Sequence, residues 1–121
     1  MKEHEPLKVL EAARQYALQV AELAKRLPKH APSKLRTQLV ESARSVGANI
    51  AEGFGRGTTA EKLHYSRIAN GSLEESQEHL RECVNTHLVD PAEFRKPWNL
   101  SVVTSRMLRS LIEKLERRKA G

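Results

Sequence analysis

Apolar residues recur every three or four positions along almost the whole chain and do not alternate with polar residues over any useful length. In the first stretch these apolar positions are Leu10, Ala13, Ala17, Val20, Ala24 and Leu27. Because an α-helix turns once in about 3.6 residues, this spacing places them on one face and predicts an amphipathic helix. Three similar stretches follow. Together they predict helices over residues 6–27, 33–52, 58–88 and 91–118.

Short polar segments separate the predicted helices. Pro28 stops the first helix, and Ser33 is suited to cap the second. Helices joined by short connections pack as antiparallel neighbours. The sequence therefore predicts an all-α, up-down four-helix bundle in which residues 1–121 form one domain.

Capping signals mark the starts of the last two helices. Thr58 is followed three residues later by Glu61, and Asp90 is followed three residues later by Glu93, as in a capping box. Pro97 lies near the start of the fourth helix and has no backbone N–H to donate. We therefore expect a break or kink near Pro97.

The third helix carries polar residues where a bundle core would be apolar. Gly47 and Gly71 also lie inside helices, where each costs about 1 kcal/mol relative to Ala. One interpretation is that helices approach closely at these glycines, with Asn49 and Asn70 hydrogen-bonded across the gap. The other is that one face of the third helix is solvated. The expected inner positions of that helix are Leu63, Ser66, Asn70, Leu73, Gln77, Leu80, Val84 and Leu88.

The run "GFGRG" at residues 53–57 can be interpreted as a phosphate-binding loop or as a turn. Phosphate-binding loops with glycine fingerprints follow a strand and have a different glycine spacing. No strand is predicted before this run. We therefore expect it to end the second helix and reverse the chain, with Phe54 packed against the bundle.

Composition agrees with a soluble helical protein rather than a secreted or membrane one. Apolar residues make up 39% and aromatic residues 4% of the chain, and no stretch approaches a membrane span. Cys83 is the single cysteine, which excludes an internal disulfide. A cytoplasmic location without contact with a membrane is the expectation.

Candidate chemistry is sparse. His79, Cys83 and His87 are four residues apart, so a zinc site is one interpretation, but one straight helix cannot close three ligands around an ion. Three unrelated polar residues are the simpler interpretation. The acidic residues of the third helix indicate a solvated face or, with Glu52, a partner-binding surface; they are Glu74, Glu75, Glu78 and Glu82. We expect no enzymatic activity, metal or cofactor.

Positive charge is unevenly distributed. The formal net charge is +6, and residues 25–67 hold nine Lys and Arg against three Glu. Such a balance favours phosphate-rich partners, although it is also consistent with charge that only keeps the protein soluble. Few aromatic residues are present for stacking on bases, so we expect contacts to the nucleic-acid backbone. The candidate nucleic-acid-binding residues are Lys34, Arg36, Arg44, Arg56, Lys62, Arg67, Arg117, Arg118 and Lys119.

Two segments carry a family resemblance. The first is "ANIAEGFGR" at residues 48–56 and the second is "GSLEE" at residues 71–75. They match the patterns ANIAEG-x-GR and GSL-x-E, and the sequence resembles the four-helix-bundle family encoded in intervening sequences of bacterial 23S ribosomal RNA genes. The matching motif residues are Asn49, Glu52, Gly53, Gly55, Arg56, Gly71, Ser72 and Glu75.

The resemblance implies a ring-shaped homopentamer without established enzymatic activity. A looser similarity is to the accessory variability protein of diversity-generating retroelements, which uses a basic ring surface to bind a reverse transcriptase and nucleic acid. Two functions are therefore expected as alternatives. One is binding of ribosomal or other structured RNA or DNA through basic surface, and the other is protein interaction, for example as an accessory subunit of a reverse transcriptase. A metal-dependent enzyme using the His79–His87 face is a third and weaker hypothesis.

Overall fold

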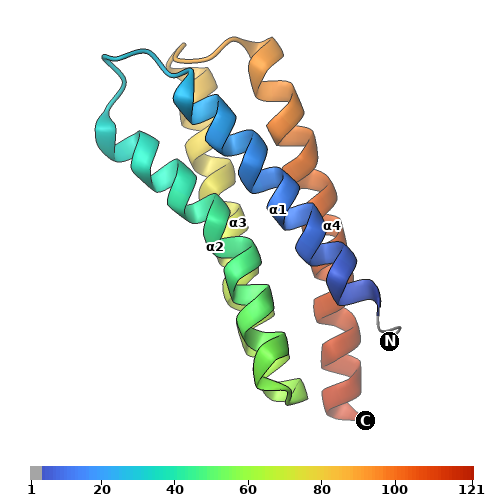
Figure 1. Cartoon of the computed structure of the whole chain (residues 1–121). Coiled ribbons are helices and arrows are strands. Elements are labelled where there is room, and N and C mark those ends of the chain that lie inside the picture. Colours follow the sequence, from blue (N-terminus) through green and yellow to red (C-terminus); the bar gives the residue numbers. More distant parts are fainter. Residues whose placement is uncertain (1–3) are drawn as a thin grey trace.

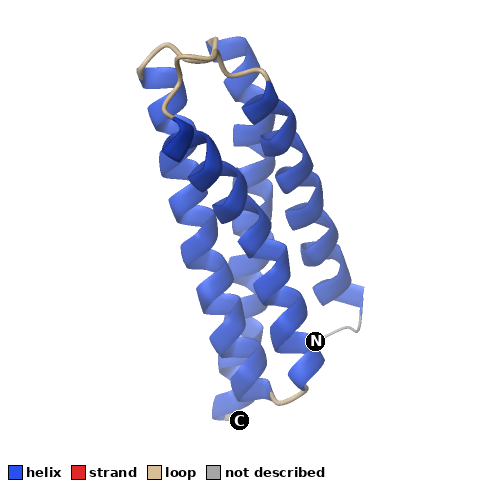
Figure 2. Cartoon of the chain, turned by 60° about the vertical axis from the view of Figure 1, so that its left-hand side comes forward, coloured by secondary structure: helices blue, strands red, loops and turns tan. Residues whose placement is uncertain are grey.

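A computed structural model describes residues 4–121 and shows four long helices (Figure 1). They are α1 (His4–Lys25), α2 (Ser33–Arg56), α3 (Thr59–Asn85) and α4 (Pro91–Ala120). Over these residues there is no strand. The helices run alternately up and down, and each packs against two others, α2 with α1 and α3, and α4 with α1 and α3 (Figures 1 and 2). The predicted all-α four-helix fold is confirmed.

The core is built from the apolar stripes that the three- and four-residue spacing predicts. It runs the length of the bundle, and its largest fully buried apolar side chains come from all four helices. Burial of a Leu or Val side chain contributes about 1.5 to 3 kcal/mol, so these stripes hold the helices together. They include Val20, Leu23, Leu39, Val46, Ile50, Leu73, Leu80, Leu108, Leu111 and Leu115.

The glycine run is mostly helical, which corrects the expected end of the second helix at residue 52. Helix α2 continues through Gly53 and Gly55 to Arg56, and only Gly57, with a φ of 94°, takes the left-handed conformation of a helix end. Gly53 is buried against α3, where a Cβ atom would lie 2.8 Å from the Cβ of Tyr65. Phe54 packs against the core as expected. Of the five residues in this run, only Gly57 lies outside α2 and belongs to the α2–α3 connection.

The expected helix breaks and caps are partly corrected. Helix α4 is continuous through Pro97, which is buried, so a break there was the wrong prediction. Ser33 is the first residue of α2 and makes no capping hydrogen bond. The other two signals are confirmed. The Thr58 hydroxyl accepts from the Glu61 N–H at 3.1 Å, and the Asp90 N–H donates to the Glu93 carboxylate at 3.3 Å.

The inner face of α3 is shifted by one residue from the predicted one at several turns. Ala69, Ser76 and Cys83 are buried, whereas Asn70, Gln77 and Val84 are only partly buried. Steps of three and four both fit a 3.6-residue turn, so adjacent positions compete for the inside. The buried Ser76 hydroxyl is satisfied by the Leu73 carbonyl and by the Tyr16 hydroxyl, at 2.9 and 2.7 Å.

The expected hydrogen bond between Asn49 and Asn70 is absent from the described residues. Asn49 donates to the Ser45 carbonyl and hydroxyl in its own helix, and Asn70 donates to Glu74. Ser45 makes the contact between helices instead, with the Ser72 hydroxyl at 2.8 Å. Short hydroxyls reach one another across closely packed helices, whereas each amide finds a partner one turn away.

A neighbouring helix lies within contact distance of Gly47 but not of Gly71, the two glycines where close approach was expected. Gly47 is buried, and a Cβ there would be 3.5 Å from the Leu10 side chain of α1, an ordinary contact distance. Gly71 is exposed, and a Cβ there would meet no atom within 4 Å. The tightest approach is at Gly53, which the sequence pattern placed in a turn.

Tyr16 gives the bundle a pH dependence at alkaline pH. Burial raises the pKa of its phenol from the ordinary 10.0 to about 12, while the hydrogen bond with Ser76 acts in the opposite direction. The unfolded chain therefore loses this proton first as the pH rises. The contribution of Tyr16 to the free energy of unfolding is fully present below about pH 10. It is lost as the pH rises towards 12, and the total loss is up to about 3 kcal/mol.

We therefore expect Tyr16→Phe to remove this loss of stability while costing about 1 kcal/mol at neutral pH through the missing hydrogen bond. Urea denaturation at about pH 8 and about pH 11 measures the difference in unfolding free energy. Tyr65→Phe, at a half-buried site, is the matched control and keeps the wild-type decline. An equal decline in Tyr16→Phe and wild type contradicts the assignment to Tyr16.

Candidate nucleic-acid interface

Six of the nine candidate cations gather at one end of the bundle. Helix α2 ends, α3 begins and α4 ends at this lower end of Figure 1, and we call it the α2–α3 pole. The ion pair between Arg67 of α3 and Glu116 of α4, at 2.8 Å, shows that the two helices are adjacent there. The cations of the pole are Arg56, Lys62, Arg67, Arg117, Arg118 and Lys119.

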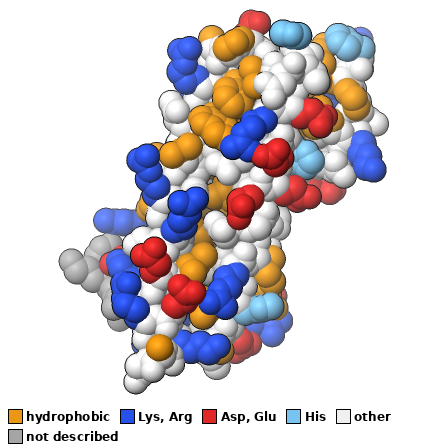
Figure 3. Space-filling model, turned by 180° about the vertical axis from the view of Figure 1, so that it is seen from behind, with side chains coloured by type: hydrophobic (Ala, Val, Ile, Leu, Met, Phe, Trp, Pro, Cys, Tyr) orange, Lys and Arg blue, Asp and Glu red, His pale blue; other side chains and the backbone are white. Residues whose placement is uncertain are grey.

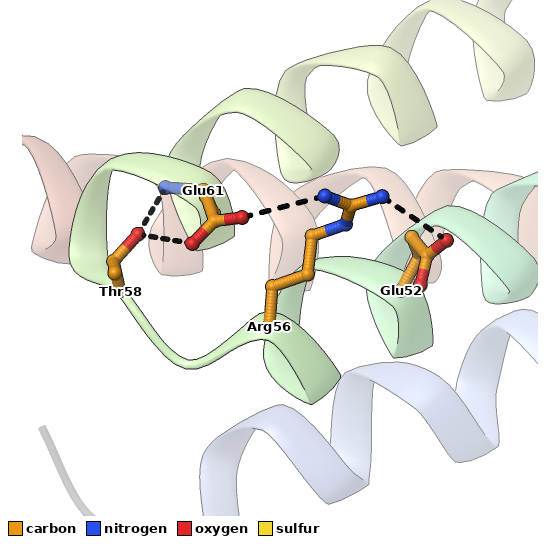
Figure 4. A network of polar contacts seen from close by, with 4 residues as sticks. All are labelled: Glu52, Arg56, Thr58 and Glu61. Atoms are coloured by element: carbon orange, nitrogen blue, oxygen red, sulfur yellow. Dashed lines mark hydrogen bonds and ion pairs between the residues drawn. The ribbon is translucent and has the colours of Figure 1, made fainter.

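Arg56 lies at the centre of a polar network that joins α2 to α3 (Figure 4). Its guanidinium contacts the carboxylates of Glu52 at 3.8 Å and Glu61 at 3.5 Å, and it lies 5.1 Å from the centre of the Tyr65 ring. Glu61 is fixed in turn by Thr58, whose hydroxyl donates to it at 2.8 Å. Arg56 is thus held in place, with its charge largely compensated by two carboxylates.

The other cations of the pole differ in how they are engaged. Lys62 places its ammonium 5.1 Å from the centre of the Phe54 ring. Arg117, Arg118 and Lys119 are exposed in the last turn of α4, and among the described residues no carboxylate forms an ion pair with them. Cations in this position interact favourably with the helix dipole. They also present three unpaired positive charges to solvent.

The remaining candidates do not belong to the pole. Lys34 is exposed at the opposite end, at the start of α2. Arg36 donates to the carbonyl oxygens of Ala24 and Pro28, at 2.5 and 3.1 Å, and so closes the end of α1. Arg36 therefore has a structural role at this end of α1, and its contact with nucleic acid stays a prediction. Arg44 lies midway along α2, in a groove with Arg14 of α1.

Arg14 is absent from the candidate residues predicted from the sequence, because the residues around it have the pattern of an ordinary amphipathic helix. Its significance depends on α2, which packs beside it and contributes Arg44 to the same groove. A possible signal was its place among Ala13, Ala17 and Leu18, where a cation borders small apolar residues.

The rest of the surface carries no broad patch of one sign on the side seen in Figure 3. Lys and Arg side chains are mixed there with Asp and Glu. The acidic residues expected to form a face of α3 are all exposed, and two are engaged within α3: Glu74 accepts from Asn70 and Glu78 pairs with Arg81. Mixed charge gives a phosphate backbone little net attraction, so the pole is the stronger candidate.

The two motifs of the family resemblance meet in the α2–α3 pair. Asn49 of the first motif donates to the Ser45 hydroxyl at 2.9 Å, and that hydroxyl bonds Ser72 of the second motif. Together with Gly53 and the Arg56 network, these residues fix how α2 packs on α3. Five motif residues are exposed, and three of them, Gly55, Gly71 and Glu75, take no part in these contacts.

The three possible zinc ligands are not brought together. Cys83 is buried in the core, and burial, followed by the charge of Glu82, raises the pKa of its thiol to about 11. His87 lies beyond the end of α3 with a positive φ of 61° and is exposed. Within residues 4–121 no group of three or more His, Cys, Asp or Glu could hold a metal ion. A shared His79–Cys83–His87 face was therefore the wrong interpretation.

Comparison with known proteins gives a family and a fold. The model of a family described as 23S rRNA-intervening sequence protein matches residues 5–110. A crystal structure from Bacteroides thetaiotaomicron VPI-5482, described as a protein of unknown function from the S23 ribosomal protein family, superimposes with a TM-score of 0.80. It is 23% identical, and the match covers 86% of this chain and 97% of that one. No curated protein matches the chain. Among the described residues, no helix is long and apolar enough to cross a membrane.

Proposed function

Because this chain belongs to the family of 23S rRNA-intervening sequence proteins, we propose that it is a non-enzymatic bundle that binds structured RNA or DNA through the α2–α3 pole. The observation that carries the proposal is the exposed group Arg117, Arg118 and Lys119, which has no ion-pair partner among the described residues. Lys62 and Arg67 lie at the start of the adjacent helix α3. The other three candidates, Lys34, Arg36 and Arg44, lie apart from one another along α2.

The chemistry of the pole suits contact with phosphates rather than reading of bases. Arg offers a planar group with several donors and Lys a mobile point charge, and both neutralise phosphate oxygens. The aromatic rings near the pole, Phe54 and Tyr65, are partly buried and already contact Lys62 and Arg56. Stacking on unpaired bases therefore contributes little here. Affinity is expected to depend on salt more than on sequence.

A direct test is a binding titration of the purified protein with a labelled, structured fragment of 23S ribosomal RNA at low salt. The proposal predicts saturable binding that weakens as salt is added. A duplex DNA of similar length is the second probe, because phosphate contacts alone do not distinguish the two strongly. Absence of binding to both probes at low salt contradicts the proposed function.

We also propose that copies of the chain assemble, as the resemblance to ring-shaped pentamers implies. Assembly repeats each pole around one axis, so weak phosphate contacts from several copies act together. Light scattering gives the absolute mass in solution, for which the proposal predicts about five times the 13.7 kDa of one chain. A mass equal to one chain contradicts assembly but leaves the RNA titration as a separate test.

The second candidate function is protein interaction, for example as an accessory subunit of a reverse transcriptase. One observation favours a protein-binding role. A surface groove between α1 and α2 is lined mostly by apolar side chains. The exposed acidic face of α3, with Glu75 and Glu82 free of ion pairs among the described residues, is a further possible contact. Co-purification with a co-expressed reverse transcriptase tests this candidate, and separate elution of the two proteins contradicts it.

A further inference from the structure

An open groove lies between α1 and α2, on the side of the bundle away from α3 and α4. Its volume is about 490 Å³. Small residues form most of its lining, among them Ala17 and Ala21 from α1 and Gly47, Ala48 and Ala51 from α2, and Leu18 of α1 joins them. Leu18 is 58% exposed and adds a large apolar side chain to the surface of the groove.

Two arginines border this groove from opposite sides. Arg14 belongs to α1 and Arg44 to α2, and both are exposed. Over residues 4–121, neither forms an ion pair or a side-chain hydrogen bond. The Arg14 side chain lies over Gly47, with its Cγ 3.9 Å from where a Cβ at that position would be, an ordinary contact distance. The groove thus has an apolar floor and one positively charged side chain on each side.

This combination decides between classes of occupant. A phosphate backbone could contact the two arginines, but its polar groups would be buried against alanine and leucine, which costs free energy. A helix with apolar residues at every third or fourth position would cover the floor, while acidic residues beside that stripe would reach the two arginines. From Ala13 to Ala21 the groove follows α1 for about 12 Å, or a little over two helical turns.

We propose that the α1–α2 groove is a docking site for an amphipathic, acidic helix of another protein. The apolar stripe of that helix covers Leu18 and the alanines, and its carboxylates pair with Arg14 and Arg44. The inference deepens the second candidate function by giving the chemistry of the partner. It is independent of phosphate binding at the α2–α3 pole.

The test uses two labelled synthetic helices with the same Leu and Ala stripe, one flanked by Glu and the other by Lys. Fluorescence anisotropy with the full chain is expected to show that the Glu peptide binds at least about tenfold more tightly. The double variant Arg14→Glu with Arg44→Glu is expected to reverse this preference. Leu18→Ala is expected to weaken both peptides, because it removes apolar area from the floor.

A control with the same change in net charge is Lys29→Glu with Arg109→Glu, at exposed positions outside the groove. This control is expected to keep the preference for the Glu peptide. Because the two double variants have the same net charge, they are expected to bind RNA with equal affinity. Equal binding of the two peptides, no binding of either, or an unchanged preference in the groove double variant overturns the proposal. So does a fall in solution mass seen only in the groove variants, since a second copy would then occupy the groove.

Discussion

Gly53→Ala is expected to lower the free energy of unfolding by about 2 kcal/mol, although alanine favours helix over glycine. The new Cβ would lie 2.8 Å from the Tyr65 Cβ, 3.2 Å from the Glu61 carbonyl oxygen and 3.3 Å from the Lys62 Cα. Two of these three atoms belong to the backbone of α3, so no side-chain rotation relieves the contact. The start of α3 must move away from α2. Urea denaturation followed by circular dichroism measures the change.

Gly71→Ala is the matched control, with the same substitution inside the neighbouring helix. Its Cβ would meet no atom within 4 Å, so the gain in helix preference is expected to raise the unfolding free energy by up to about 1 kcal/mol. The two variants should therefore differ in sign. If Gly53→Ala is as stable as Gly71→Ala, α2 and α3 do not pack as closely at residue 53 as the structure has them.

The second large effect is expected from Arg117→Ala, Arg118→Ala and Lys119→Ala combined. Removing three unpaired cations at the α2–α3 pole is expected to weaken RNA binding about tenfold to a hundredfold at low salt, without loss of helix content. The double variant Arg117→Lys with Arg118→Lys, which keeps Lys119, should retain most of the affinity, since phosphate contacts need charge more than a particular side chain.

The control for the combined variant removes three exposed cations from the opposite end of the bundle: Lys29→Ala, Arg95→Ala and Lys96→Ala. The change in net charge is the same in both variants, so long-range attraction falls equally. We expect a much smaller loss of affinity in this control. Equal losses in the two variants would show that total charge, and not the pole, determines binding.

Helix number and order could be predicted from the sequence because apolar spacing is a local property. The caps of α3 and α4 could be predicted for the same reason, since Thr58 and Asp90 each act on a residue three positions away. The end of α2 could not. Glycine disfavours a helix by itself, and only packing against Tyr65, twelve residues later, shows why Gly53 stays helical.

The candidate site was less predictable, because charge counts do not show which charges are paired. Arg36 looks like a free cation in the sequence, yet its partners are backbone carbonyls of α1 and of the residues that follow it. Arg67 pairs with Glu116, 49 positions away, which no local pattern indicates. The sequence did place Arg117, Arg118 and Lys119 together, and the structure leaves them exposed. Neighbours in one helix turn are predictable, and partners from another helix are not.

The salt dependence of RNA affinity measures how many phosphate contacts the protein makes. For wild type, three to five contacts predict a plot of log affinity against log salt with a slope of about −3 to −5, at about 0.9 per contact. The variant lacking the cations at residues 117–119 is expected to have a slope smaller in magnitude by about 3. A wild-type slope near zero, or an identical slope in wild type and variant, would contradict binding through the α2–α3 pole.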